Sequence, residues 1–272
     1  MRRIPLSAII GLTITAAYFL AAIFAPFLAP YGMSDVVGGV WEPSSATYWL
    51  GTDGIGRDLL TRMIYGGQTT IAIATAATIL SFGTGATLGL TAAVIGGWVD
   101  QALSRFVDLV MSIPTLIFAL VVLSVMPVNI LTLILVMGFL DATRPFRVAR
   151  AVAVDIAVMD YVEAARLRGE GRLWIIFREV LPNALSPLVA EMGLRFIFQV
   201  LLLSTLSFLG LGVQPPMADW GGIVKENKEG IVYGVTAALY PAIAIATLAI
   251  SVNLVADWIL NRTTSLKGGR GG

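Results

Sequence analysis

The sequence predicts an all-α membrane protein that crosses the bilayer several times. Of its 272 residues, 57% are hydrophobic and only 13% are charged, whereas about a quarter of the residues of a soluble domain are charged. Six apolar segments approach or exceed the length needed to cross a hydrocarbon core of about 30 Å. Inside lipid the backbone must satisfy its own polar groups, so each segment is expected to be a helix. We therefore predict a polytopic protein with six transmembrane helices.

Residues 1–68 are expected to form an N-terminal unit, a transmembrane helix followed by an outer loop. The apolar segment runs from about Ser7 to Leu28, behind the basic start Met1-Arg2-Arg3. A secretory signal peptide has a shorter apolar stretch and a small-residue cleavage site. The alanines near position 22 permit cleavage, but about 20 apolar residues match a full span. We therefore expect a retained helix rather than a removed leader.

Residues 69–265 are expected to form a core of five further transmembrane helices. Their apolar segments are Thr69–Ile95, Phe106–Met126, Val128–Ala142, Leu188–Leu211 and Val235–Leu260. The segment that begins at Val128 is shorter than the roughly 20 residues of a full span. Because Arg144 and Arg147 follow it at once, we expect a helix shielded by its neighbours, with arginines at its cytoplasmic end. The glycine-rich stretch 266–272 predicts a disordered tail.

The placement of lysine and arginine predicts the orientation. If the N-terminus is inside, the cytoplasmic segments hold thirteen of the 18 basic residues and the outer segments hold four, while Arg195 lies within a span. An excess of basic residues marks the cytoplasmic side, so both termini are expected to be cytoplasmic. The long loop at about 143–187 is then cytoplasmic, and the loop at about 29–68 lies outside.

Small residues recur on one face of the first core segment. Gly85, Gly89 and Ala93 are spaced four apart, which places them on the same side of a helix. Such a stripe lets a second helix approach closely. That helix can belong to the same chain or to a partner subunit.

The composition excludes several chemistries. The chain has no cysteine and no histidine, which rules out disulfides, thiol catalysis, zinc sites and Ser-His triads. No Gly-Lys dipeptide occurs, so a phosphate-binding loop for ATP is missing as well. The net charge of +1 gives no reason to expect a nucleic acid partner. We expect no catalytic residue, no metal site and no cofactor in this chain.

The cytoplasmic loop contains a pattern for two short helices joined by glycines. Asp160 is placed to cap a helix in which Glu163 is the third residue, as in a capping box. Gly169 and Gly171 then end that helix and permit a sharp turn.

A second short helix is expected to begin at Arg172. It would expose the apolar side chains Trp174, Ile175 and Phe177, and Pro182 would stop it. Two helices that are apolar on one side and basic on the other suit a groove on another protein. The alternative is a basic amphipathic segment that lies on anionic lipid.

Here the sequence resembles a known family. Six positions of the loop match the EAA loop of ABC importer permeases in residue type and spacing: Glu163, Ala164, Ala165, Gly169, Leu181 and Pro182. The resemblance implies that these residues couple the chain to an ATPase subunit, and that the fold is that of a type I ABC importer permease. Glu179 departs from the pattern, because the family usually has an aliphatic residue there.

Two outer motifs narrow the resemblance. Residues 50–58 precede the second span, and residues 206–216, followed by Trp220-Gly221, come after the fifth. Both stretches are rich in turn-forming residues, which favours rigid loop anchors over direct substrate contact. As patterns they are similar to the C-type permease of the dipeptide, oligopeptide and nickel importer family, and the similarity runs from about Tyr48 to the end of the last span.

The family resemblance implies the function and the partners. The chain would form half of the translocation pathway of an importer for di- or oligopeptides, working by alternating access in a bacterial inner membrane. Its expected partners are a B-type permease subunit in a heterodimer, two ATP-binding subunits that hold ATP and magnesium, an extracytoplasmic solute-binding protein and the lipid bilayer. An opine, a modified amino acid or a nickel chelate remains open as the solute.

Two other classes of protein compete with this interpretation. An ion-coupled secondary transporter or channel would work as a single chain without ATP, and it would carry acidic residues deep in its spans. Asp108, Asp141 and Asp257 instead fall near the ends of predicted spans. An intramembrane enzyme would need histidine, cysteine or paired aspartates at mid-membrane.

Three polar residues mark a possible pathway for the solute. Glu191, Arg195 and Gln199 are spaced four apart, so they share one face of the fifth predicted span. A charged side chain at the bilayer centre costs about 2.5–3.5 kcal/mol and usually faces a cavity or a partner. The alternative is an ion pair within the helix, Glu191 with Arg195, that reaches toward the cytoplasmic interface.

Overall fold

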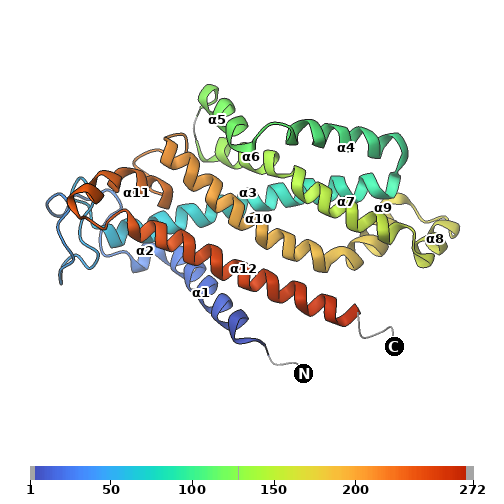
Figure 1. The fold of residues 1–272 in the computed structure, drawn as a ribbon, viewed down its shortest axis with the longest axis horizontal. Coiled ribbons are helices and arrows are strands. Elements are labelled where there is room, and N and C mark those ends of the chain that lie inside the picture. Colours follow the sequence, from blue (N-terminus) through green and yellow to red (C-terminus); the bar gives the residue numbers. More distant parts are fainter. Residues whose placement is uncertain (1–3, 128, 268–272) are drawn as a thin grey trace.

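The chain forms a bundle of long helices in a computed structural model that describes residues 4–127 and 129–267 (Figure 1). No strand occurs in these residues, which contain two isolated β-bridges. The helices are α1 (Leu6–Ile23), α2 (Ala25–Leu28), α3 (Leu59–Ile95), α4 (Gly97–Met111), α5 (Thr115–Val125), α6 (Ile130–Asp141), α7 (Thr143–Ala157), α8 (Asp160–Leu167), α9 (Arg172–Trp174), the π-helical η1 (Ile175–Val180), α10 (Leu181–Leu209), α11 (Trp220–Asn227), the 3₁₀-helical η2 (Lys228–Tyr233) and α12 (Leu239–Lys267). The all-α prediction is confirmed.

Four helices of the described residues are long and apolar enough to cross a membrane. They are Leu6–Ile23, Leu59–Ile95, Arg172–Leu209 and Leu239–Leu260. A fifth crossing is added if α4 and α5, which meet at an angle of 81°, are counted as one broken span. The number six stays a prediction, because α6 has only 12 residues.

The predicted span Phe106–Met126 is broken in its middle. Helix α4 ends at Met111, and α5 starts at Thr115 after Pro114. A proline disfavours the helical conformation of the residue before it, which explains why the chain bends between the two helices. The apolar stretch was visible in the sequence, but the break places α4 and α5 along different directions.

The predicted helix Val128–Ala142 does not end before its arginines. Asn129 caps α6 by accepting a hydrogen bond from the Thr132 N–H. Ala142 itself has helical backbone angles, so α6 passes into α7 with almost no interruption. Arg144 and Arg147 therefore lie inside a helical run that continues to Ala157, and their position at the cytoplasmic side stays a prediction.

Helix α3 forms the centre of the bundle and packs closely against α7. A Cβ atom added to Gly85 would collide with the Ala142 carbonyl, and one added to Gly89 would collide with the Phe146 carbonyl. Ala93 packs at the edge of the hydrophobic cluster that contains Ala149. The stripe of small residues therefore serves contact within the chain, because side chains at these positions would hold the two backbones apart.

The two ends of the bundle differ. Helix α11 and the loop before α3 gather at one end, while α8 and α9 lie at the other (Figure 1). The start of α1 and the C-terminal part of α12 point toward the end that carries α8. Of the tail predicted at 266–272, residues 268–272 lie outside the described residues, and residues 266 and 267 are helical rather than disordered.

Candidate coupling hairpin and membrane-buried polar cluster

The segment 160–182, which we call the EAA hairpin, begins with α8. Its N-cap is Met159, whose carbonyl accepts from the N–H groups of Val162 and Glu163. The predicted capping box at Asp160 is wrong, since the helix starts a residue earlier and no side chain caps it. Asp160 and Glu163 instead lie in the first turn, where negative charge is favourable to the helix dipole.

Gly169 ends α8 through its backbone conformation. Its φ is +85°, its N–H donates to the Arg166 carbonyl at 3.0 Å, and the Glu170 N–H donates to the Ala165 carbonyl at 3.2 Å. This pair of bonds is a Schellman motif, which requires a left-handed residue at the position of Gly169. Gly171 has an ordinary φ of −70° at the start of α9, so Gly169 alone makes the predicted turn.

The second arm of the EAA hairpin is continuous with a long membrane helix. Residues Arg172 to Leu209 form a single helical run of 38 residues. The prediction that Pro182 stops this helix is wrong, because Pro182 lies in the first turn of α10, where a missing N–H is tolerated. The turns before it are π-helical, and the Leu181 N–H donates to Ile176, five residues back.

The six predicted coupling residues divide into an exposed group and an inward group. Glu163, Ala164, Gly169 and Pro182 are exposed. Ala165 is fully buried in a cluster with Val162, Ile175, Ile176 and Val180, and Leu181 packs at its edge. The small side chain at position 165 therefore lets α8 lie directly against η1. Of the three apolar residues expected to be exposed, Trp174 and Phe177 are accessible and Ile175 is buried.

Glu179, which departs from the family pattern, joins the two arms. Arg168 lies 3.9 Å from Glu179 and 3.9 Å from Glu170, and its guanidinium lies 6.0 Å from the Trp174 ring. Because Arg168 is more than half exposed, water screens these pairs, and each contributes at most about 1 kcal/mol. They orient the turn rather than hold it together.

The three pathway candidates lie together in a buried polar cluster, which we define as Ser81, Asp141, Glu191, Arg195 and Gln199. The Arg195 guanidinium lies 2.8 Å from Glu191 and 3.2 Å from Asp141. Asp141 also accepts hydrogen bonds from Ser81 at 3.1 Å and from Gln199 at 3.4 Å. The helices α3, α6 and α10 thus each contribute to this cluster.

Asp141 is the member that sequence reasoning missed. It was placed near the end of a span, but it is 8% exposed and faces Arg195, which is 5% exposed. A guanidinium buried this deeply needs compensation from charge, and Glu191 from the same helix supplies only part of it. The need for a second carboxylate is the signal that could have pointed to Asp141.

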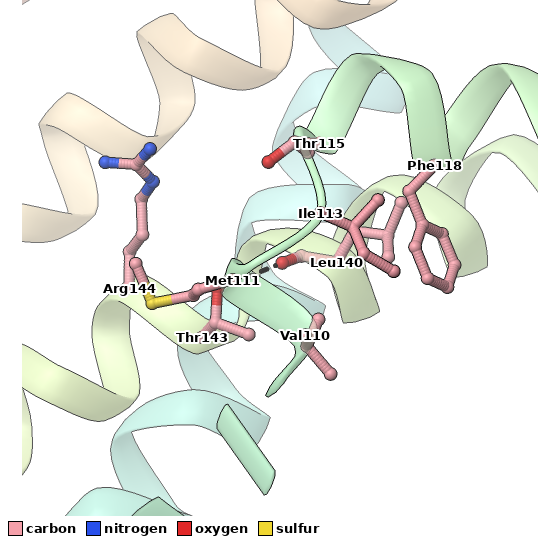
Figure 2. Close-up of a pocket in the computed structure, with 8 residues that line it drawn as sticks. All are labelled: Val110, Met111, Ile113, Thr115, Phe118, Leu140, Thr143 and Arg144. Atoms are coloured by element: carbon pink, nitrogen blue, oxygen red, sulfur yellow. Dashed lines mark hydrogen bonds between the residues drawn. The ribbon is translucent and has the colours of Figure 1, made fainter. Parts of the chain in front are cut away.

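A cavity of 330 Å³ adjoins the polar cluster. It is lined by Thr115, Leu116, Asp141, Arg144, Phe198, Gln199, Leu201, Leu202 and Thr205. A smaller cavity of 30 Å³ lies where α4 breaks from α5, and Thr115 and Arg144 line both spaces. Figure 2 shows the Thr115 hydroxyl pointing to the side of the smaller cavity on which Arg144 extends.

Comparison with known proteins assigns this architecture to a family. A sequence profile described as "binding-protein-dependent transport system inner membrane component" matches residues 85–265, more than half of the chain. The chain belongs to this family. It is therefore an ABC transporter permease, an inner membrane component of a binding-protein-dependent transport system, and the match covers both the EAA hairpin and most of the polar cluster.

Three relatives match nearly the whole permease. A putative peptide transport system permease protein of Brucella suis is 36% identical over 251 residues, covering 91% of this chain and 84% of its own. The dipeptide transport system permease protein DppC of Alkalihalophilus pseudofirmus is 30% identical over 252 residues, covering 92% and 83%. The glutathione transport system permease protein GsiD of Pectobacterium atrosepticum is 29% identical over 238 residues, covering 87% and 79%.

At the end of the bundle that carries α11, two arginines share two carboxylates. Arg57 lies 2.6 Å from Asp53 and 2.6 Å from Glu226, and Arg62 lies 3.4 Å and 2.6 Å from the same two residues. Asp53 and Arg62 are almost completely buried. The motif at residues 50–58 is therefore tied to α3 and α11, which favours the role of a rigid anchor. Sequence reasoning had not paired these residues.

The second outer motif fixes the start of α11. Asp219 accepts hydrogen bonds from the N–H groups of Gly221 and Gly222, at 3.1 and 3.3 Å. The indole of Trp220 is buried and donates to the Met63 carbonyl of α3 at 3.0 Å. Burial raises the pKa of Asp219 from 3.8 to about 6, although its hydrogen bonds act in the opposite direction.

We find no candidate metal site in the part of the chain that the structure describes. These residues contain no group of three or more His, Cys, Asp or Glu side chains placed to hold a metal ion. The polar cluster contains only two carboxylates, and both face Arg195. In this cluster one guanidinium is held by carboxylates from two helices, and Arg144 adds positive charge at longer range.

Proposed function

We propose that this permease is one of two membrane subunits of an ABC importer for di- and oligopeptides, and that the EAA hairpin couples it to ATP hydrolysis by separate subunits. The names of the relatives support the solute class, since they are described as peptide, dipeptide and glutathione transport permeases. The observation that carries the coupling proposal is the unbroken helix from Arg172 to Leu209. One continuous helical run thereby joins the EAA hairpin to the polar cluster.

In this proposal the exposed residues of the EAA hairpin contact the ATPase and the inward residues transmit its motion. Glu163, Ala164 and Gly169 form the accessible surface of α8 and its turn. Ala165 and Leu181 hold α8 against the second arm, and Pro182 lies where η1 enters α10. Large exposed apolar side chains such as Leu167 and Leu173, which are 84% and 70% exposed, suit a protein partner.

The two ends of the bundle support a proposal for where each partner binds. Two ATP-binding subunits, which carry the ATP and magnesium, are proposed at the end that presents α8. A solute-binding protein is proposed at the opposite end, over α11 and the outer loop, and a B-type permease completes the pathway. Because the start of α1 and the C-terminal part of α12 point toward the α8 end (Figure 1), we place both termini in the cytoplasm.

The polar cluster is proposed to border the solute pathway. Gln199 lines the cavity of 330 Å³ directly. Glu191 and Arg195 act from behind it, by holding Asp141 in the cavity wall. Differential binding of the partners to two conformations of the helices would then drive alternating access.

The test is reconstitution of the complete complex in proteoliposomes. Uptake of a labelled tripeptide should require ATP, the ATP-binding subunits and the solute-binding protein. Uptake by the permease alone without nucleotide would contradict the proposal.

Reversing the charge of Glu163 tests the coupling surface. Glu163→Arg should lower the ATP hydrolysis stimulated by loaded binding protein at least about tenfold, the loss expected when a charged contact is replaced by repulsion. The matched control is Asp155→Arg, which reverses an exposed acid of α7 outside the EAA hairpin and should leave the stimulation near the wild-type level. Equal effects of the two variants would remove the reason for assigning the contact to α8.

A further inference from the structure

Arg144 differs from the other two arginines of α7 in its contacts, although its charge acts at longer range on Glu191. Arg147 lies 3.3 Å from Asp108, and Arg150 donates to Asp100 at 2.6 Å. Among the residues that the structure describes, no carboxylate lies within ion-pair distance of Arg144. Its guanidinium instead lies 5.8 Å from the centre of the Phe198 ring of α10.

Arg144 is exposed in this chain and lies beside α10, which is long and apolar enough to span a membrane. Phe198 precedes the end of α10 at Leu209 by about 16 Å, at 1.5 Å per residue. The hydrocarbon core is about 30 Å thick, so the Phe198 ring and the Arg144 guanidinium beside it lie within one bilayer thickness of the end of α10. A charge inside the hydrocarbon core is unfavourable against lipid and faces water or another charged group.

The cavity of 330 Å³ provides a place for such a group. Arg144 and Gln199 both line it, together with the hydroxyl-bearing side chains of Thr115 and Thr205. The Oε1 atom of Gln199 is buried and accepts no hydrogen bond from any described residue. The cavity wall therefore combines the exposed Arg144 guanidinium, the Asp141 carboxylate that is already directed at Arg195, and an unused acceptor.

Arg195 is not available to bind a further charged group in the cavity. Both of its carboxylate neighbours, Glu191 and Asp141, are already directed at it. A guanidinium that stacks on an aromatic ring keeps its N–H groups free to bind a carboxylate in a bidentate manner. The Phe198 ring lies 4.5 Å from the Arg195 guanidinium and 5.8 Å from that of Arg144. Of these two arginines, Arg144 is the one that has no carboxylate of the described residues within ion-pair distance.

We propose that Arg144 recognises the terminal carboxylate of the solute as it crosses the membrane, with the Gln199 carbonyl accepting from a peptide N–H. This inference rests on the proposed function and names the side chains of the proposed pathway that contact the solute. Phe198 holds the guanidinium in place, and the Glu191–Arg195–Asp141 pairs position the opposite wall. The solute class is a small peptide with a free carboxyl end.

The experiment uses the complete complex in proteoliposomes and two probes, trialanine and trialanine amide, each supplied at equal occupancy of the binding protein. In the Arg144→Gln variant, uptake of trialanine per ATP hydrolysed should fall about tenfold, which is the ratio that one charged hydrogen bond provides. Uptake of the amide should not change. Arg144→Lys keeps the charge without the bidentate geometry, so it should lose less.

Arg147→Gln is the matched control, because it removes an exposed arginine of α7 that is paired with Asp108 outside this cavity. It should leave the ratio of the two probes unchanged. An equal loss of both probes in Arg144→Gln, or no loss of either, overturns the inference. Loss of the partner permease on purification also overturns it, since Arg144 would then pair with that subunit. A wild-type complex that imports neither peptide refutes the proposed function itself.

Discussion

At the scale of single residues, Asp219 is a buried carboxylate that is held by N–H groups. Gly221 and Gly222 donate to it at the start of α11, and no cation among the described residues lies within ion-pair distance. The positive end of the helix dipole favours the charged form, but burial outweighs this effect and raises the pKa to about 6. The folded permease therefore binds a proton at Asp219 more tightly than the unfolded chain does.

This difference predicts a dependence of stability on pH. A carboxylate whose pKa rises on folding contributes most below its unfolded pKa of 3.8, and the contribution is lost as pH rises to about 6. Between pH 4.5 and 7.5 the loss should be about 2 kcal/mol. Thermal unfolding in detergent should show that Asp219→Asn is less sensitive to pH than the wild type over this interval, and identical slopes would contradict the assignment.

Residue spacing alone predicted part of the polar cluster. Glu191, Arg195 and Gln199 share a face of one helix, and a period of four residues is visible in any sequence. Asp141 could not be found in this way, because it reaches Arg195 from another helix, across 54 residues of chain. The continuation of α6 into α7 was also missed, since the apolar stretch ends at Ala142 and Arg144 and Pro145 follow it.

At the scale of elements, the EAA hairpin depends on one turn. Gly169 adopts a left-handed conformation, which costs other residues about 1–2 kcal/mol. An added Cβ at Gly169 would meet no atom within 4 Å, so the requirement comes from the backbone and not from space. Gly171 has equal space and an ordinary φ, which makes the two glycines a matched pair.

The pair gives a direct test of the turn. Gly169→Ala should strain the Schellman motif and shift α8 relative to η1, so ATP hydrolysis stimulated by the loaded binding protein should fall several-fold. Gly171→Ala should stay near the wild-type value. If both variants keep full stimulation in proteoliposomes, the orientation of α8 does not limit coupling.

The elements themselves were predictable to different degrees. Long apolar stretches gave α1, α3, α10 and α12, because burial in lipid leaves no alternative to a helix. Pro182 misled the prediction, since the π-helical turns of η1 carry the helix past a residue that has no N–H. The π-helical turns of η1 have no signal in the sequence that we can identify.

At the scale of the whole molecule, the permease presents two chemically different ends. The outer loop and α11 are locked by the ion pairs among Asp53, Arg57, Arg62 and Glu226. The opposite end carries the EAA hairpin with its exposed apolar side chains. One end is thus held together by ion pairs, and the other end leaves apolar side chains of the EAA hairpin uncovered.

The absence of cysteine from the sequence makes the sidedness directly measurable. Ser44→Cys in the outer loop and Leu173→Cys in the EAA hairpin both introduce an exposed thiol. The labelling uses cells whose outer membrane has been made permeable and whose inner membrane is intact. A maleimide that does not cross the inner membrane should label Ser44→Cys in these cells, and it should label Leu173→Cys only after lysis. The reverse pattern would invert the orientation inferred from basic residues.

The run from Arg172 to Leu209 links movements at its two tips wherever it moves as one body, and Pro187 inside it is the place where a kink would uncouple them. Its 38 residues extend about 57 Å, so a tilt of about 10° about the midpoint swings each tip by about 5 Å in opposite directions. Glu191 sits at that midpoint and Arg195 one turn beyond it. In such a tilt Glu191 and Arg195, which lie close to the midpoint, would hardly move. Phe198 and Thr205 lie further from the midpoint and would move by increasing distances along the cavity.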